Sequence, residues 1–187
     1  MTSIGSYEVK IRVKSGIKQV AFVSPAKADD MPSNWTFDWP GLWYMMNFEC
    51  ENIVKLVYED QVWGLVRYSL YPYPGYPKFL EIGQLEANPT SRGEVAERFI
   101  EPIGKWLIWY ATKVALQYCQ VKANDPLVLL IALDSAMSYY ESKIGMEYLG
   151  CDTIAPGEDG YAFRFLRKAA VAFCHQQESI WGVPRPI

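Results

Sequence analysis

The chain has 187 residues, of which 50% are hydrophobic and 15% aromatic, and it carries a formal net charge of -3 with a pI near 5.3. Such a length supports one well-packed core, so we expect a single domain over residues 1–187, with its core at about 7–168 and a C-terminal tail at 169–187. The acidic balance provides no basic stripe to displace counterions from phosphates, which argues against nucleic acid as a partner.

Two features argue against export and membranes. The N-terminal sequence MTSIGSYEVK lacks the apolar core of a signal peptide. The most apolar helix candidate, Ile103–Tyr118, contains two lysines and is shorter than the roughly 20 residues that a bilayer requires. The four cysteines show no short pairing or metal-ligand spacing, as in buried thiols of a reducing compartment: Cys50, Cys119, Cys151 and Cys174. We therefore expect a cytoplasmic protein with no membrane partner.

The single histidine limits the chemistry of the chain. Because His175 stands alone in the tail, a His-rich metal site is impossible, and we expect no metal. A Ser-His-Asp or Cys-His nucleophile would require the tail to fold back. Acid–base chemistry therefore falls to Glu, Asp, Tyr or Lys.

The first part of the chain predicts two strands and an irregular region. Alternating apolar and charged residues predict a strand over Tyr7–Lys14, and a second short strand follows at Gln19–Val23. The segment Ser24–Glu51 is rich in Pro, Trp and Tyr, and it favours irregular structure or a short helix. Its aromatic residues either pack into the core and its rim or form an acceptor-binding surface.

A hairpin and a loop come next. The segments Ile53–Tyr58 and Val62–Tyr71 predict a β-hairpin in which Gly64 marks a bulge. The proline-rich run Tyr71–Pro77 is either a docking segment in an extended left-handed helix or a rigid loop, and the loop is the commoner case.

The stretch Lys78–Gln117 predicts a buried strand, a polar loop and a core helix. Its first third has strand character, and Asn88-Pro89 ends the strand. After the polar segment Thr90–Pro102, Gly104 opens a helix that is almost wholly apolar and therefore belongs inside the domain. A helix N-terminus exposed at such a turn can hold an anion.

The last third predicts a central strand, a helix and a final strand pair. The unbroken apolar run Leu127–Leu133 suits a strand covered on both faces. Asp134-Ser135 can cap a helix over Ala136–Ile144, which Gly145 can end. We expect strands at Met146–Ile154 and Tyr161–Leu166 joined by a turn at 156–160, and a tail that starts helical at Ala169 and then frays. The order predicts a mixed sheet with helices on both sides.

Several segments resemble the GCN5-related N-acetyltransferase (GNAT) superfamily. The spacing of Ala136, Tyr140, Gly145 and Met146 resembles its C-terminal motif, and the strand and helix within residues 78–117 are similar to its fourth strand and third helix. Residues 35–39 further resemble a divergent, poorly characterised GNAT-like branch. The resemblance implies an α/β (α+β) fold, with a mostly antiparallel mixed sheet flanked by helices and parallel strands at about 79–87 and 127–133 that splay apart.

The chain departs from the family pattern at two places. Of the glycines in the family's pyrophosphate loop only Gly104 remains, and Glu101 would lie near phosphates and repel them. Alternatively, Arg92-Gly93 supplies the start of the loop, with residues 94–102 as an insertion. The second departure is one extra residue between Tyr140 and Gly145, which could turn the tyrosine away from its usual place.

The resemblance implies transfer of an acyl group from an acyl-CoA, such as acetyl-CoA, to an amine. Glu81 matches the position of the family's general base, and Glu86 is the rival; in a regular strand their odd spacing places them on opposite faces. The alternative for either glutamate is an ordinary solvated or salt-bridged strand carboxylate. Tyr140 would be the general acid, or else a tyrosine packed on the sheet.

The resemblance also implies where coenzyme A would bind. A backbone N–H within Leu85–Ala87 would polarise the thioester carbonyl, pantetheine would lie between the splayed strands, and the pyrophosphate would meet the helix start at Ile103–Trp106. The candidate cofactor-binding residues are Leu85, Glu86, Ala87, Arg98, Ile103, Gly104, Lys105, Trp106, Asp134 and Ser135.

Three functions remain open at this stage. The first is a CoA-dependent N-acyltransferase whose partners are an acyl-CoA and an amine-bearing small molecule or peptide. The second is a catalytically degenerate GNAT-like module that binds CoA or a protein. The third is an interaction protein that uses the aromatic residues of Trp35–Tyr44 and Tyr71–Pro77, and a homodimer is compatible with all three.

Overall fold

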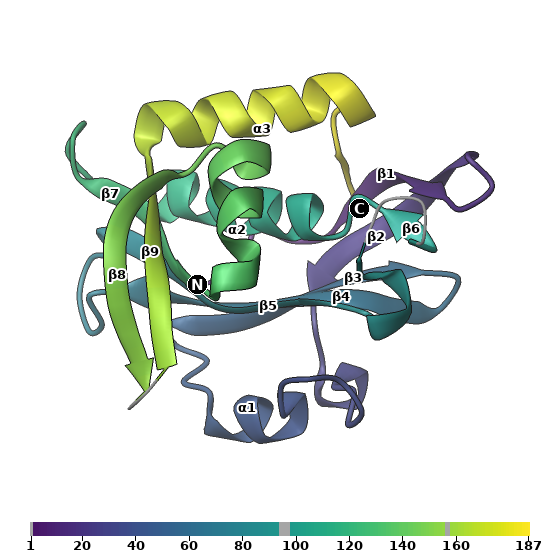
Figure 1. The fold of residues 1–187 in the computed structure, drawn as a ribbon, viewed down its shortest axis with the longest axis horizontal. Helices are drawn as coiled ribbons and strands as arrows, with labels where there is room; N and C mark the ends of the chain where they lie inside the picture. Colours follow the sequence, from purple (N-terminus) through teal and green to yellow (C-terminus); the bar gives the residue numbers. More distant parts are fainter. Residues whose placement is uncertain (1, 94–97, 156–157) are drawn as a thin grey trace.

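The computed structural model describes residues 2–93, 98–155 and 158–187 (Figure 1). The helices and strands, in chain order, are β1 (Tyr7–Val13), β2 (Lys18–Pro25), η1 (Ala28–Asp30), α1 (Trp39–Met45), β3 (Glu51–Tyr58), β4 (Gln61–Tyr71), β5 (Phe79–Ala87), η2 (Pro89–Ser91), β6 (Ile100–Glu101), α2 (Gly104–Tyr118), β7 (Pro126–Ala132), η4 (Asp134–Ala136), η5 (Tyr139–Ile144), β8 (Glu147–Ala155), β9 (Glu158–Leu166), α3 (Arg167–Trp181) and β10 (Arg185–Pro186).

The described strands form one sheet, in the order β10-β1-β2-β3-β4-β5-β7-β9-β8, with β6 paired to β1. Neighbouring strands are antiparallel except β5 and β7, which run parallel from Leu80↔Val128 to Ile82↔Leu130. This arrangement confirms the predicted mixed sheet and its single parallel pair. The predicted turn at 156–160 lies partly outside the described residues, and Glu158 onward already belongs to β9.

The hairpin of β3 and β4 has its bulge beside Gly64, as predicted. Leu56 pairs with Gly64 while Val57 pairs with Val62, so Trp63 is the extra residue. A Cβ at position 64 would lie 2.3 Å from Cγ2 of Ile103, so the glycine also allows α2 to approach the sheet closely.

A second bulge, in β5, changes which side chains share a face. Tyr68 pairs with Ile82 and Arg67 with Gln84, which leaves Gly83 as the extra residue. Glu81 therefore lies opposite Ser69, and Glu86 lies opposite Leu65. Ser69 and Leu65 are four positions apart on β4. Even spacing on the partner strand places both glutamates on one face. The expectation of opposite faces is wrong because the strand is not regular.

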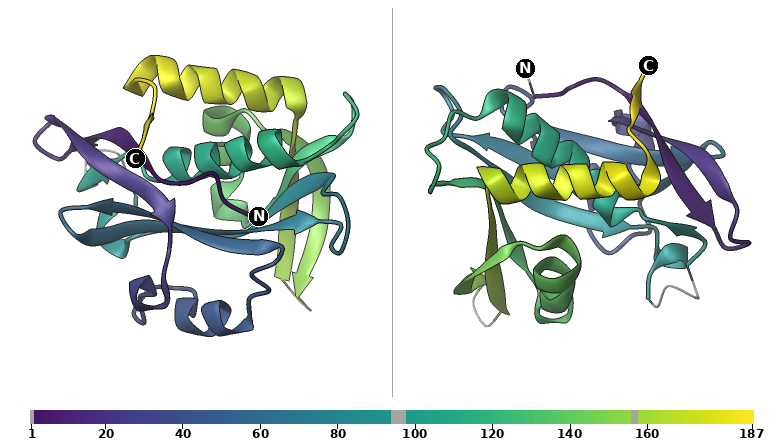
Figure 2. Two further views of the ribbon diagram at one scale, coloured as in Figure 1. Left: turned by 180° about the vertical axis from the view of Figure 1, so that it is seen from behind. Right: turned by 90° about the horizontal axis from the view of Figure 1, so that it is seen from above.

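The two faces of the sheet are covered unequally. Helices α2 and α3 lie over one face, and the short α1 lies against the other (Figures 1 and 2). Helix α2 is buried along almost its whole length, including Trp106 and Trp109 at 0% and 2% exposure. On the opposite face, the fully buried Trp39 of α1 packs with Ile53 and Leu65. The predicted short helix is thus present, and Trp39 is a core residue.

The C-terminal residues are ordered, so the predicted frayed tail is wrong. Helix α3 places Phe173 and Cys174 in the main core, and β10 pairs with β1 through Tyr7↔Pro186. Three of the cysteines are buried free thiols as expected, but Cys151 is exposed on the edge strand β8. No helix in the described parts of the chain has the length and apolar character needed to cross a membrane.

Candidate functional site

The candidate site lies where the two parallel strands separate. Among the described residues, no ladder pair joins β5 to β7 beyond Ile82 and Leu130. After the bulge at Gly83, β5 keeps its pairing with β4 from Gln84 to Ala87 and has an open edge toward β7. Open backbone N–H and C=O groups can bind a ligand, and three cavities follow this edge.

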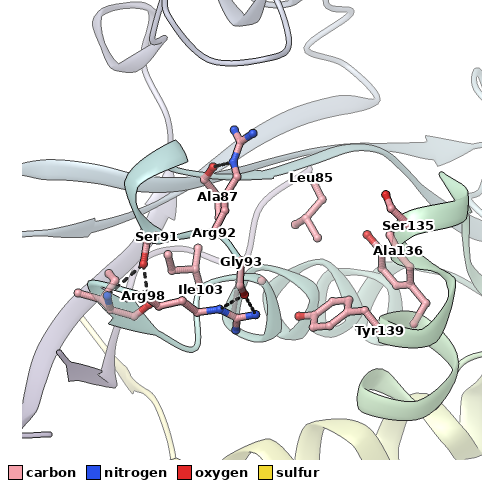
Figure 3. A pocket seen from close by; sticks show the side chains of 13 residues that line it. Leu85, Ala87, Ser91, Arg92, Gly93, Arg98, Ile103, Ser135, Ala136 and Tyr139 are labelled. Carbon is pink, nitrogen blue, oxygen red and sulfur yellow. Dashed lines mark hydrogen bonds between the residues drawn. The ribbon is translucent and has the colours of Figure 1, made fainter. Parts of the chain in front are cut away.

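The first cavity, of about 400 Å³, lies at the start of α2. Figure 3 shows the guanidinium of Arg98 and the hydroxyl of Tyr139 pointing toward each other across it. Arg98 donates to the carbonyl of Gly93 from Nε at 3.0 Å and from an Nη at 2.8 Å. The residues that line this first cavity are Leu85, Ala87, Ser91, Arg92, Gly93, Arg98, Ile100, Ile103, Gly104, Ser135, Ala136, Tyr139 and Tyr140.

This cavity has the groups that bind an anion. The N-cap Ile103 provides no side-chain hydrogen bond to the first turn of α2, and the guanidinium of Arg98 lies at the wall, whereas that of Arg92 is bound to Glu86, Thr36 and the carbonyl of Ala87. A Cβ at position 104 would lie 2.8 Å from the hydroxyl oxygen of Tyr139, so glycine allows that hydroxyl to lie close to the start of α2. The residues present therefore fit a diphosphate.

The expected repulsion by Glu101 is not found in this arrangement. Its carboxylate accepts a hydrogen bond of 2.9 Å from Nε of Arg12 and forms an ion pair with that guanidinium. Glu101 pairs with Arg12 through β6 and β1 and does not line the cavity. Arg92-Gly93 and Gly104 both line it, as the alternative alignment of the loop requires, although residues 94–97 of that insertion lie outside the described residues.

The second cavity, of about 380 Å³, continues the first along β5 and includes Tyr140. This tyrosine lies in a π-helix, η5, whose wider turn takes up one more residue than an α-helical turn. The extra residue before Gly145 is therefore absorbed, and Tyr140 still faces the groove, lining both cavities. Burial raises the pKa of Tyr140 to about 12, so its hydroxyl stays protonated at neutral pH.

The start of that helical segment differs from the prediction. The turn η4 precedes η5, and neither element has a side-chain capping hydrogen bond, so Asp134 and Ser135 do not cap it. Ser135 lines the first two cavities, whereas Asp134 is exposed and interacts with Tyr161.

Glu86 reaches the second cavity, but its carboxylate is committed to the segment before α1. It accepts hydrogen bonds from the backbone N–H of Thr36 at 2.7 Å, from that of Phe37 at 3.2 Å and from Nε1 of Trp39 at 2.7 Å, and it pairs with Arg92. Burial alone would raise the pKa of Glu86, but these donors outweigh it and leave the pKa below its ordinary value. A carboxylate so occupied is a poor proton acceptor.

The third cavity, of about 390 Å³, continues the groove to Glu81. Among the described residues, the Glu81 carboxylate has no hydrogen-bond or ion-pair partner. Arg67 is engaged instead with Glu51 at 2.7 Å and Gln84 at 3.0 Å. The lining residues are Phe37, Arg67, Ser69, Tyr71, Glu81, Ile82, Gly83, Gln84, Ile131 and Leu133.

The remaining predicted residues lie at the margin of the site. Lys105 is half-buried, and burial, followed by the charge of Lys143, lowers its pKa. Trp106 is buried, its indole N–H donates to the carbonyl of Lys10 at 2.8 Å, and its backbone N–H already donates to Ile103 at 3.1 Å. Phe37 belongs to the aromatic segment that the sequence offers as an acceptor-binding surface. Other lining residues are not among the predicted site residues: Ser91 in η2, Tyr139 in η5 and Leu133 after β7.

Comparison with known proteins identifies solved structures that have a similar fold. No protein-family model and no curated protein matches the sequence. Among solved structures, an uncharacterized protein from Bacillus halodurans is similar at a TM-score of 0.64 and 10% identity, covering 95% of this chain and 98% of that one. Arabidopsis thaliana Naa50, in complex with a CoA-containing bisubstrate analogue, is similar at a TM-score of 0.55 and 12% identity, covering 76% of this chain and 96% of that one.

A third similar structure is aminoglycoside acetyltransferase AAC(6')-Ib in complex with coenzyme A and kanamycin, at a TM-score of 0.54 and 13% identity, covering 80% of this chain and 96% of that one. Identities this low establish common architecture only. The splayed parallel pair, the mostly antiparallel sheet and these matches agree with the fold expected from the sequence. The chain has the fold of the GNAT acetyltransferases.

Proposed function

We propose that this protein is an N-acyltransferase that transfers an acetyl group from acetyl-CoA to an amine. The observation that carries the proposal is one continuous groove, which runs from the start of α2, along the open edge of β5, to the unpaired carboxylate of Glu81. Adjoining cavities share residues: Leu85 and Tyr140 line the first two, and Phe37 and Gln84 line the last two. A donor and an acceptor can therefore meet in the middle.

The residues of the first cavity would hold the CoA moiety. The start of α2 and the guanidinium of Arg98 would bind its pyrophosphate, and the open edge Gln84–Ala87 would hydrogen-bond its amide chain. The solved structures that share this fold include complexes with coenzyme A or a CoA analogue, which supports the assignment. The acetyl thioester would then lie near Tyr140.

Glu81 would remove a proton from the incoming amine. An ammonium group has a pKa near 10 and cannot attack a thioester until it loses a proton. A backbone N–H within Leu85–Ala87 would stabilise the negative charge on the tetrahedral intermediate, and the protonated hydroxyl of Tyr140 would give its proton to the departing thiolate. The nitrogen–carbon bond forms first. The carbon–sulfur bond then breaks as the intermediate collapses, and the nitrogen gives up its second proton, which replaces the one donated by Tyr140, so the products are an amide and free CoA thiol.

Release of CoA thiol tests this proposal. The protein is incubated with acetyl-CoA and a panel of primary amines, and free thiol is titrated alongside detection of the N-acetyl product by mass spectrometry. We expect amine-dependent thiol release by the wild type and its loss in Tyr140→Phe. Bound acetyl-CoA with no thiol release for any amine would contradict the catalytic part.

A second candidate function is a GNAT-like module that binds CoA or a protein without turnover. It is favoured by the absence of the family's glycine pattern before Gly104 and by the exposed apolar side chains around α1, Tyr44 at 85% and Met45 at 74%. Under this alternative, acetyl-CoA or a partner binds, but no amine releases thiol.

A further inference from the structure

We infer that the third cavity selects a singly charged primary amine carried on an apolar, aromatic-sized body, and that it excludes polyamines. The inference rests on the proposed function, since it names the acceptor class for the same groove. It is carried by three features of the cavity: its exposed apolar side chains, its single unpaired charge and its size.

Three large apolar side chains around this cavity are partly exposed. Phe37 is 38% exposed, Ile131 38% and Leu133 49%. They come from the segment before α1 and from the end of β7, and they converge on one cavity that also includes Tyr71 and Ile82. A contiguous exposed apolar surface of this kind marks a ligand or partner site, so the body of the acceptor should be apolar.

The charge of the cavity sets the number of amino groups. Arg67 brings a positive charge to the wall, but Glu51 neutralises it at 2.7 Å. Ser69 also donates to Glu51, at 3.1 Å, and so is not a partner of Glu81. The carboxylate of Glu81, the one among these lining residues, has no partner among the described residues. One ammonium group is matched by Glu81, whereas a second one would enter an apolar wall or approach the Arg67 guanidinium, which disfavours it.

The size and rigidity of the cavity favour a small ligand. Its volume of about 390 Å³ falls in the range of small-molecule pockets. The Phe37 wall is fixed from behind, because Glu86 accepts hydrogen bonds from the backbone N–H groups of Thr36 and Phe37. A preformed wall next to Glu81 suits a compact arylalkylamine.

Four amines that share a primary amino group separate the alternatives. Phenylethylamine has an apolar body, ethanolamine a polar one, and putrescine and spermidine carry further charges. With saturating acetyl-CoA we expect kcat/KM for phenylethylamine to exceed that for each of the others by about tenfold or more. Equal rates for ethanolamine, or a preference for either polyamine, would overturn the inference while leaving the proposed function intact.

A matched pair of variants locates the effect. Leu133→Asp adds a second carboxylate to the cavity, and Leu149→Asp makes the same change at a side chain that is 46% exposed on β8, outside the groove. We expect Leu133→Asp to lower kcat/KM for phenylethylamine about tenfold and to raise it for putrescine, and Leu149→Asp to change neither. Unchanged selectivity in Leu133→Asp would contradict the inference. Ile131→Asp is the substitute should Leu133→Asp fail to fold, as judged by circular dichroism.

A binding readout keeps this inference separate from catalysis. Calorimetric titration of the CoA-saturated protein with each amine should show the same order, with phenylethylamine bound at least about tenfold more tightly than ethanolamine or putrescine. If no amine releases thiol but this order holds, the proposed function fails and the selective pocket stands. If thiol is released but the amines do not bind in this order, the selective pocket fails and the proposed function stands.

Discussion

The carboxylate of Glu86 accepts a hydrogen bond of 2.7 Å from the indole N–H of Trp39, which fastens α1 and the segment before it to the open edge of β5. Both side chains are buried, at 5% and 0% exposure. The Glu86 carboxylate also accepts hydrogen bonds from the backbone N–H groups of residues 36 and 37 and forms an ion pair with the Arg92 guanidinium. Glu86 is therefore a structural anchor that connects the first cavity, through Arg92, to the third, through Phe37.

Replacing Glu86 by Gln should destabilise the protein. The amide nitrogen would face N–H donors, leaving at least one buried donor unsatisfied, at a cost of about 1–3 kcal/mol in the free energy of unfolding. Urea unfolding near neutral pH measures this loss. The matched control is Glu81→Gln, on the same face but unpaired, which should unfold like the wild type. Equal stability of Glu86→Gln and the wild type would remove the anchoring role.

The same anchor predicts a pH dependence of stability. Because the folded-state pKa of Glu86 is below its ordinary value of 4.5, its contribution is present above that pH and is lost as the pH falls through the lower, folded value. The free energy of unfolding of the wild type should therefore decrease more steeply than that of Glu86→Gln between about pH 5 and the acid limit. Parallel curves for the two proteins would contradict this.

Glu81→Gln should instead affect the rate. With no general base, kcat/KM at neutral pH should fall roughly a hundredfold, and the deficit should shrink toward pH 10, because the amine then deprotonates without help. A pH profile of kcat/KM for wild type and variant measures this convergence. A deficit that stays constant with pH would indicate that Glu81 positions the acceptor and does not remove its proton.

Tyr140→Phe should lower kcat roughly a hundredfold or more while leaving the Kd for acetyl-CoA unchanged, because only the leaving-group proton is lost. Since burial raises the pKa of Tyr140 to about 12, the wild type should show no alkaline loss of activity from this group below about pH 10. Steady-state kinetics and calorimetry separate the two quantities, and Tyr139→Phe is the neighbouring control with an unchanged kcat. Equal kcat values for wild type and Tyr140→Phe would refute the acid role.

Gly104→Ala should weaken CoA binding about tenfold, equivalent to about 1.4 kcal/mol. The added methyl group would lie 2.8 Å from the Tyr139 hydroxyl and force that ring into the first cavity. The phenyl carbon behind the hydroxyl is 3.6 Å away, so Tyr139→Phe in the same chain should restore binding. Titration of the single and double variants with acetyl-CoA tests this, and a double variant as weak as the single one would exclude the clash.

The sequence predicted the architecture better than the site. The apolar runs of α2 and β7 and the alternation of β1 specify buried and half-buried elements directly, because burial follows apolar periodicity. In the tail, the helical start predicted at Ala169 is present within α3, whereas the predicted frayed end is wrong because Arg185–Pro186 pairs with β1, and a two-residue strand has no periodicity to reveal it.

The errors within the site come from local backbone irregularities. The bulge at Gly83 places Glu81 and Glu86 on the same face of the sheet, although their odd spacing predicts opposite faces. The glycine within the strand pattern is the sequence signal for this bulge. The π-helical turn around Tyr140 likewise absorbs an inserted residue that no propensity reveals. Lining residues such as Phe37 and Tyr139 come together only through tertiary structure, so spacing in the sequence does not identify them.

Thermal unfolding in the presence of acetyl-CoA measures whether the groove along β5 binds this ligand. At a ligand concentration of 100 times Kd the stabilisation is about 2.7 kcal/mol, which at roughly 2–4 °C per kcal/mol predicts a rise in Tm of about 5–10 °C. The rise should be smaller in Gly104→Ala at the same acetyl-CoA concentration. No shift in the wild type with acetyl-CoA, longer acyl-CoAs or free CoA would show that the groove is not a coenzyme A site.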